Sequence, residues 1–303
     1  MVEVGQLARF GQITSPFPVS AGPSEPPGPR DYCPGGTVVG VSALAGTYLE
    51  RIVSAHRDRV AADGRNLASV RDTALAMVSP ARGFAAALRV PGLSVIAEIK
   101  RRSPSKGPLA PDLDAAVLAG AYREGGAACL SVLTDVDHFG GCVDDLKAAR
   151  LASGLPVIRK DFTVGEIDVY DARLMGADCV LLIAAALDDD ELLRFHQAAT
   201  SVGLDALVEI HDEDELTRAL AVGATLVGVN QRDLRTFSVD HDRARRVGRA
   251  MPSSVVRVAE SGVRGPADAA SLAEAGFDAV LVGESLVTLA DPAQGVRALR
   301  GVR

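Results

Sequence analysis

Acidic, basic and amide side chains recur at the ends of short apolar segments along this chain. Glu98 and Lys100 end the first such segment, residues 94–100. Because side chains alternate along a strand, we expect both on one face. Later segments end in similar groups: Lys160, Glu209, Asn230 with Arg232, Glu260 and Glu284. Charge inside a protein is costly unless it is paired or used, so the recurrence points to a site.

The residue types in this set are suited to acid–base chemistry. An ammonium group can give a proton to a carbonyl oxygen, and a desolvated carboxylate can remove one. We expect burial and a nearby cation to lower the pKa of such a lysine toward neutrality.

Small residues after the last two apolar segments predict a phosphate site, because their backbone N–H groups can face an anion. A short helix beginning at Glu284 would point its N-terminus at the phosphate. The candidates are Ser261 and Gly262 after one segment, Gly283, Glu284 and Ser285 after the next, and Arg102 and Ser103 in the loop after residue 100.

The elements that must hold these groups follow a regular alternation. Eight apolar segments of strand length occur at residues 94–100, 129–134, 156–162, 179–184, 205–210, 226–230, 255–261 and 279–283. Amphipathic stretches between them end in glycine, the usual left-handed residue after a helix. The pattern predicts an α/β fold, a single closed (βα)8 TIM barrel whose active site lies at the carboxyl ends of the strands. An open doubly wound sheet would want a glycine-rich turn after the first strand, where KRRSPSKG is basic.

The N-terminal part differs from the rest. Residues 1–42 are rich in Pro, Gly and Ser and are interpreted as a disordered tail, and residues 43–303 as the barrel domain. An amphipathic helix is predicted over about residues 44–62, where it can cover the base or overhang the mouth of the barrel. A second helical stretch precedes Pro91.

Composition narrows the function classes. The net charge of −7 argues against a nucleic-acid binder. No apolar run approaches the ~20 residues of a membrane span, and because no basic segment followed by an apolar one occurs near residue 1, we expect no secretory signal. The cysteines have no metal or disulfide spacing, which favours the cytoplasm. Since His138, His196, His211 and His241 are scattered in predicted loops and helices, we expect no metal and no organic cofactor, and ordinary surface or supporting roles for these histidines.

Six motifs, in this order, resemble those of the indole-3-glycerol phosphate synthase family: VIAEIKRRSPSKG, PVIRKDF, LVEIH, GVNQRDLRTF, VAESGV and VLVGESL. The resemblance covers about residues 44–300. It implies the substrate 1-(2-carboxyphenylamino)-1-deoxyribulose 5-phosphate and its ring closure with loss of CO2 and water, in tryptophan biosynthesis. The expected partner is therefore a small phosphorylated molecule, and we expect the chain to be a monomer or a weak homo-oligomer.

The resemblance also implies residue roles. Lys160 matches the general acid of ring closure. Lys100 matches the lysine that engages the substrate carboxylate and can donate a proton in dehydration. Glu209 matches the base that completes dehydration, and Glu98 the residue that orients the lysines and sugar hydroxyls. How the two lysines divide the acid roles is left open.

Further positions concern substrate binding. Asn230 and Arg232 match residues that hold the anthranilate carboxylate and its hydroxyl neighbours. Phe139 and Phe162 are candidates for an apolar wall against the anthranilate ring, or equally for core packing.

Two alternative functions agree less well with these residues. Phosphoribosylanthranilate isomerase uses a similar barrel, but with a Cys and an Asp, and the first strand here ends in Glu98-Ile99-Lys100. A non-catalytic phosphate-sugar binding protein would be favoured if the lysines and Glu209 were replaced.

Overall fold

The computed structural model describes residue 28, residues 47–233 and residues 238–301. Within them, eight parallel strands close into a barrel in the spatial order β1, β10, β9, β8, β7, β6, β5, β4. The predicted fold is therefore confirmed. The strands are β1 (Ser94–Ile99), β4 (Cys129–Leu133), β5 (Val157–Lys160), β6 (Cys179–Ile183), β7 (Asp205–Ile210), β8 (Leu226–Asn230), β9 (Val256–Glu260) and β10 (Ala279–Val282).

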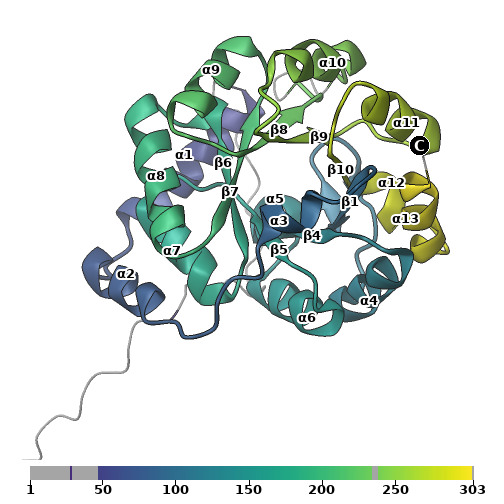
Figure 1. Ribbon diagram of the computed structural model, residues 1–303. Coiled ribbons are helices and arrows are strands. Elements are labelled where there is room, and N and C mark those ends of the chain that lie inside the picture. Colours follow the sequence, from purple (N-terminus) through teal and green to yellow (C-terminus); the bar gives the residue numbers. More distant parts are fainter. Residues whose placement is uncertain (1–27, 29–46, 234–237, 302–303) are drawn as a thin grey trace, which may run out of the picture.

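Helices surround this barrel (Figure 1). They are α4 (Ala115–Gly125), α6 (Val143–Ser153), α7 (Glu166–Met175), α8 (Asp189–Ser201), α9 (Glu213–Ala221), α10 (His241–Ala250), α11 (Pro266–Glu274) and α13 (Pro292–Arg300). Gly126 and Gly176, directly after α4 and α7, have φ of +88° and +90°. A left-handed residue of this kind ends a helix at no steric cost when it is glycine, so the predicted helix ends are confirmed here.

Strand alternation divides the side chains between two apolar regions. On β1, Val95, Ala97 and Ile99 face the layer between strands and helices, whereas Ile96 faces the interior of the barrel. Residue 98 therefore points into the interior. The same parity sends Lys160 inward and Arg159 outward on β5, because Ile158 belongs to the interior cluster.

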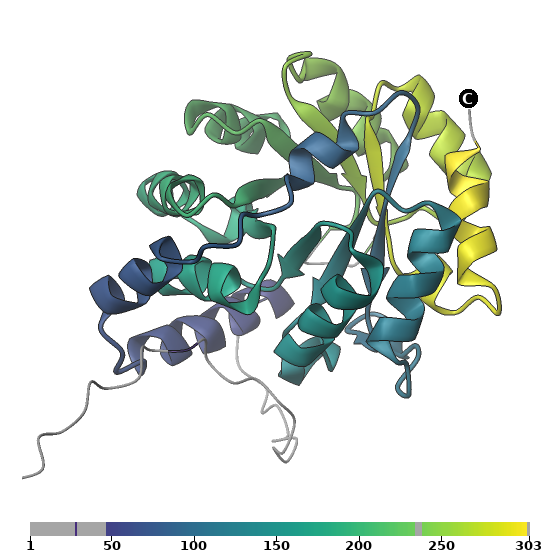
Figure 2. The same cartoon turned by 60° about the horizontal axis from the view of Figure 1, so that its bottom comes forward.

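Three further helices precede the barrel: α1 (Tyr48–Ala61), α2 (Leu67–Leu75) and α3 (Phe84–Leu88). A capping box between Thr47 and Glu50 begins α1. In Figure 2, α3 crosses the upper end of the barrel and α1 lies at the lower end. Phe84 and Leu88 of α3 join the interior cluster and close the base, so α1 is the helix that overhangs the mouth.

Short elements complete the mouth: the hairpin β2 (Arg102–Ser103) and β3 (Gly107–Pro108), α5 (Val136–Phe139), the 3-10 turn η1 (Ala184–Ala186) and α12 (Glu284–Val287). The short helix predicted after residue 283 is thus present. Of the predicted tail, residues 1–42, only Gly28 lies within the described residues, and its carbonyl accepts a hydrogen bond from Arg65. The tail boundary stays a prediction. No described helix is both long and apolar enough to cross a bilayer.

Candidate active site

A cavity of about 770 Å³ opens at the carboxyl ends of the strands, under α1 and the β2–β3 hairpin. Most of the residues singled out in the sequence line it: Glu98, Lys100, Ser103, Phe139, Lys160, Phe162, Glu209, Asn230, Arg232, Ser261, Gly262, Gly283, Glu284 and Ser285. Arg102 does not. Its guanidinium instead donates to the carbonyls of Val136 and Asp137 in α5, so it braces one loop against another.

Five charged side chains meet in the barrel interior below this cavity, and we call them the lumen cluster: Glu98, Lys100, Lys160, Glu209 and Glu260. Lys160 Nζ lies 3.1 Å from Glu209 Oε2 and 3.5 Å from Glu260 Oε2. Lys100 Nζ lies 2.5 Å from Glu98 Oε1. Each of these residues lies at an inward-facing position of its strand, or, for Lys100, just beyond the end of the strand. Four strands therefore bring their charged side chains together in the barrel interior.

Polar neighbours fix the carboxylates. Asn230 Nδ2 donates to Glu209 Oε1 at 2.9 Å, and the Asn230 side-chain oxygen accepts the backbone N–H of Arg232. Ser131 donates to Glu98 Oε2 at 3.3 Å. Glu209 thus has one oxygen held by an amide and the other facing an ammonium group.

The charges in this cluster determine one another's protonation. Burial acts to lower the pKa of Lys160, but the carboxylates of Glu209, Glu260 and Glu98 outweigh it and hold that pKa well above its usual value. Burial acts to raise the pKa of Glu209, yet the charge of Lys160 and the neighbours of Glu209 hold it below its usual value. Burial and the Glu209 charge raise the pKa of Glu260 to about 8.

The expectation of a lowered lysine pKa was therefore wrong for Lys160. The sequence places lysines at strand ends without revealing that three carboxylates would surround one of them. Lys160 is held as an ammonium ion, which is the form that a general acid needs.

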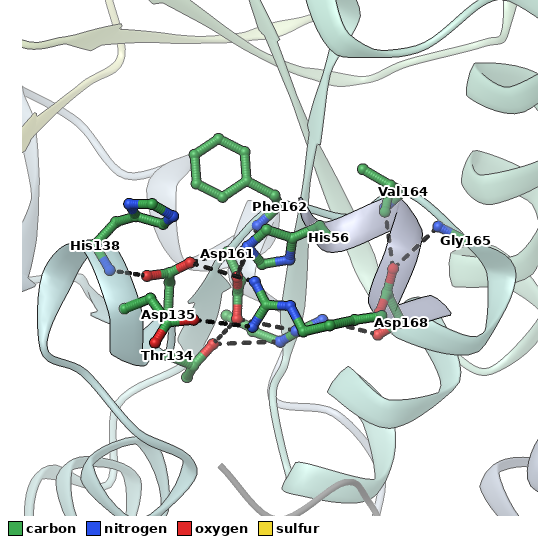
Figure 3. A network of polar contacts seen from close by, with 12 residues as sticks. His56, Thr134, Asp135, His138, Asp161, Phe162, Val164, Gly165 and Asp168 are labelled. Carbon is green, nitrogen blue, oxygen red and sulfur yellow. Dashed lines mark hydrogen bonds and ion pairs between the residues drawn. The ribbon is translucent and has the colours of Figure 1, made fainter. Parts of the chain in front are cut away.

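An aromatic wall and a second buried polar cluster lie beside the lumen. The rings of Phe139 and Phe162 both border the cavity with centroids 6.4 Å apart. Behind Phe162, His56 of α1 packs at 5.2 Å between ring centroids and its Nε2 lies 2.9 Å from Asp135 Oδ2. Figure 3 shows His56 with Phe162 and Asp135.

We call this second cluster the α1 network: His56, Thr134, Asp135, Arg159 and Asp161. Arg159 donates to Asp161 Oδ2 at 2.9 Å and to Thr134 Oγ1 at 3.3 Å. Ligand atoms of His56, Asp135 and Asp161 lie within 4.8 Å of one another, a grouping that their spacing in the sequence did not suggest. Both Asp161 oxygens and both Asp135 oxygens already accept hydrogen bonds from protein donors.

The predicted phosphate residues gather at one side of the cavity. Ser261 and Gly262 both have positive φ, +65° and +74°, and the Ser261 carbonyl accepts from Gln231 Nε2 at 2.8 Å. Ser285 Oγ donates to the Val263 carbonyl at 2.9 Å, which ties the two loops together. The Glu284 carboxylate is paired with Lys106 Nζ at 3.0 Å, so a phosphate here would meet the backbone of Glu284 and not its side chain.

Sequence reasoning noted Glu260 at a strand end but gave it no role, and it overlooked Gly228 and Lys106. Glu260 could have been found from alternation, since Val256 and Val258 share its parity and belong to the interior cluster. A Cβ at Gly228 would lie 2.0 Å from Glu260 Oε1, so this glycine makes the room for that carboxylate. Nothing in the sequence pattern marks that packing.

Fold and site together define a class: a (βα)8-barrel enzyme with paired ammonium and carboxylate groups under a mouth suited to a phosphorylated molecule. Residues 49–299 match the family model described as indole-3-glycerol phosphate synthase. The chain belongs to the indole-3-glycerol phosphate synthase family.

Individual comparisons agree with this. The chain is 48% identical over 257 residues to an indole-3-glycerol phosphate synthase of Mycobacteroides abscessus, covering 84% of this chain and 94% of that protein. It is 52% identical over 237 residues to one from a Nocardioides species, covering 78% and 91%. A solved 3-hexulose-6-phosphate synthase from Salmonella typhimurium superposes with a TM-score of 0.56 at 16% identity, covering 69% of this chain and 98% of that one. That likeness concerns the fold alone.

Proposed function

We propose that the lumen cluster carries out the reaction of this family, which closes the ring of 1-(2-carboxyphenylamino)-1-deoxyribulose 5-phosphate and releases CO2 and water. The observation that supports it most is the 3.1 Å contact between Lys160 Nζ and Glu209 Oε2 at the floor of the cavity. An acid and a base in contact, both reachable by one substrate, are what a dehydrating ring closure requires.

In the proposed order of reaction steps, Lys160 protonates the carbonyl oxygen as the new carbon–carbon bond forms and CO2 leaves. The hydroxyl group formed in this way leaves as water after Lys100 donates a proton to it. Lys100 is paired with Glu98. Glu209 then removes the proton whose loss completes the aromatic ring. Glu98 holds Lys100, and no metal or organic cofactor is needed for any step.

Binding is assigned to the rim. We propose that Asn230 and Arg232 hold the anthranilate carboxylate and that Phe139 and Phe162 flank its ring. The phosphate would lie against the backbone at the loop residues Ser261, Gly262, Gly283, Glu284 and Ser285, with Ser103 across the mouth. Arg102 is left out because its guanidinium faces α5. Cytoplasmic location, the absence of nucleic-acid partners, and the monomeric or weakly oligomeric state stay predictions.

The test is direct. Purified protein is incubated with the substrate and indole fluorescence is followed over time. Product formation is expected, and it should fall away in Glu209→Gln. Conversion of phosphoribosylanthranilate without indole formation would support the isomerase alternative, and binding without turnover would support a non-catalytic role.

A further inference from the structure

His211, predicted to be an ordinary residue, lies against the proposed base. It follows β7 two positions after Glu209, and its side chain is only 13% exposed. Its Nε2 lies 4.0 Å from Glu209 Oε1. Within the described part of the chain this buried nitrogen has no hydrogen-bond partner. An unsatisfied buried nitrogen is rare and calls for an explanation.

The other ring nitrogen fixes the tautomer. Nδ1 lies 3.1 Å from Glu215 Oε2 of α9, an oxygen that also accepts the backbone N–H of His211. An ionised carboxylate can only accept, so Nδ1 carries a proton. A neutral ring would then turn the bare lone pair of Nε2 toward the Glu209 carboxylate. A second proton on Nε2 converts that contact into an attraction between opposite charges.

The charges around the ring favour the second proton. Burial acts to lower the pKa of His211, but the hydrogen bond to Glu215 and the charges of Glu209 and Glu215 together raise it above its usual value. Arg243 of α10 is the cation that opposes them.

We propose that His211 is a positioning residue that holds Glu209 ionised, with its Oε2 turned toward Lys160 and the cavity, by presenting Nε2–H to its Oε1 side. The inference rests on the proposed role of Glu209 as the base. Asn230, at the end of β8, donates to the same Glu209 oxygen. A neutral and a charged donor would therefore both hold the Oε1 side of the carboxylate, and the Oε2 side would be available for the reaction.

The test compares the pH dependence of kcat/KM in wild type, His211→Asn and His211→Gln. Asn keeps a donor near Glu215 but removes Nε2, whereas Gln places a neutral donor near Glu209. Losing a cation at this distance should move the acidic limb of the profile upward by about one pH unit in both variants, with activity approaching wild type at high pH. His196→Asn, on α8, is the matched control and should leave the profile unchanged.

An equal loss of activity at every pH, with the acidic limb in place, would show a merely structural role and overturn the inference. If Glu209→Gln abolishes turnover while both His211 variants keep the wild-type profile, the inference fails and the proposed function stands. If Glu209→Gln stays active, both fail. Should the variants not fold, NMR titration of wild-type His211 decides: a ring that stays protonated above the ordinary histidine pKa of about 6.5 supports the inference, and one that loses its proton below that pH overturns it.

Discussion

Two buried polar clusters share strand β5 and differ in how their groups are satisfied. In the α1 network, Asp161 accepts hydrogen bonds on both carboxylate oxygens, from the Phe162 N–H and from Thr134 and Arg159. In the lumen cluster, Glu260 Oε1 has no hydrogen-bond partner within the described residues. On the α1 side of the strand both Asp161 oxygens are hydrogen-bonded, whereas on the lumen side one carboxylate oxygen can still accept a hydrogen bond.

This difference distinguishes residues that hold the geometry of the site from residues that take part in the proposed reaction. A fully satisfied buried network is rigid and specifies one geometry. Groups that must bind a substrate or move a proton cannot all be satisfied in advance, and their protonation is perturbed as a result. Lys160 lies between Arg159 and Asp161, whose hydrogen bonds hold the strand end, while its own side chain faces the cavity.

The substitution expected to have the largest effect on stability is Arg159→Met, in the α1 network. Arg159 is 1% exposed and donates to Asp161, Thr134 and the Asp168 carbonyl. Removing one partner of a buried ion pair typically costs about 3–5 kcal/mol, so urea unfolding should show a loss of that size. Arg71→Met, which breaks an exposed pair with Asp72, should cost less than about 1 kcal/mol. Similar losses in the two variants would contradict a structural role for the network.

The neighbouring substitution Lys160→Ala should have the opposite character. We expect kcat to fall by at least ~10²-fold, the usual scale for losing a general acid, while the protein still folds because the buried Glu209 carboxylate left without Lys160 can take up a proton instead of staying charged. Lys147→Ala on the exposed face of α6 is the control. Activity within a few-fold of wild type would remove Lys160 from the mechanism.

How far the sequence predicts each cluster follows from the range of the interactions. Side-chain alternation and the succession of strands can be recognised in the sequence. They predict that Glu98, Lys160 and Glu209 point into one lumen, even though no individual contact is known. The His56–Asp135 contact joins residues 79 positions apart, and no local pattern marks it. The raised pKa of Lys160 was mispredicted for the same reason, since it depends on carboxylates contributed by other strands.

A smaller effect is expected at the phosphate side with Gly283→Asp. An added Cβ at Gly283 would lie 2.4 Å from Glu98 Oε1, so even Gly283→Ala should displace Glu98 and lower kcat, at a cost of about 1–3 kcal/mol for overpacking. The aspartate adds a negative charge beside the proposed phosphate position and should raise KM as well. Gly64→Asp, at a position with open space around its Cβ, is the control. An unchanged KM in a folded Gly283→Asp protein would move the phosphate elsewhere.

The finest test of the comparison is the pH dependence of stability in Glu260→Gln. Burial and the Glu209 charge raise the pKa of Glu260 from 4.5 to about 8. Between these values the folded chain keeps a proton that the unfolded chain has released, so this group makes the free energy of unfolding fall as pH rises through the window. Glutamine does not titrate. Wild type should therefore lose stability relative to Glu260→Gln as urea unfolding is repeated from about pH 5 to about pH 8. Asp268→Asn tests the opposite sign, because the pKa of Asp268 is lowered by Arg264, and its stabilising contribution is lost only in acid. Parallel stability curves for wild type and Glu260→Gln would mean that Glu260 is ionised throughout, and that the lumen cluster carries its excess negative charge without holding a proton.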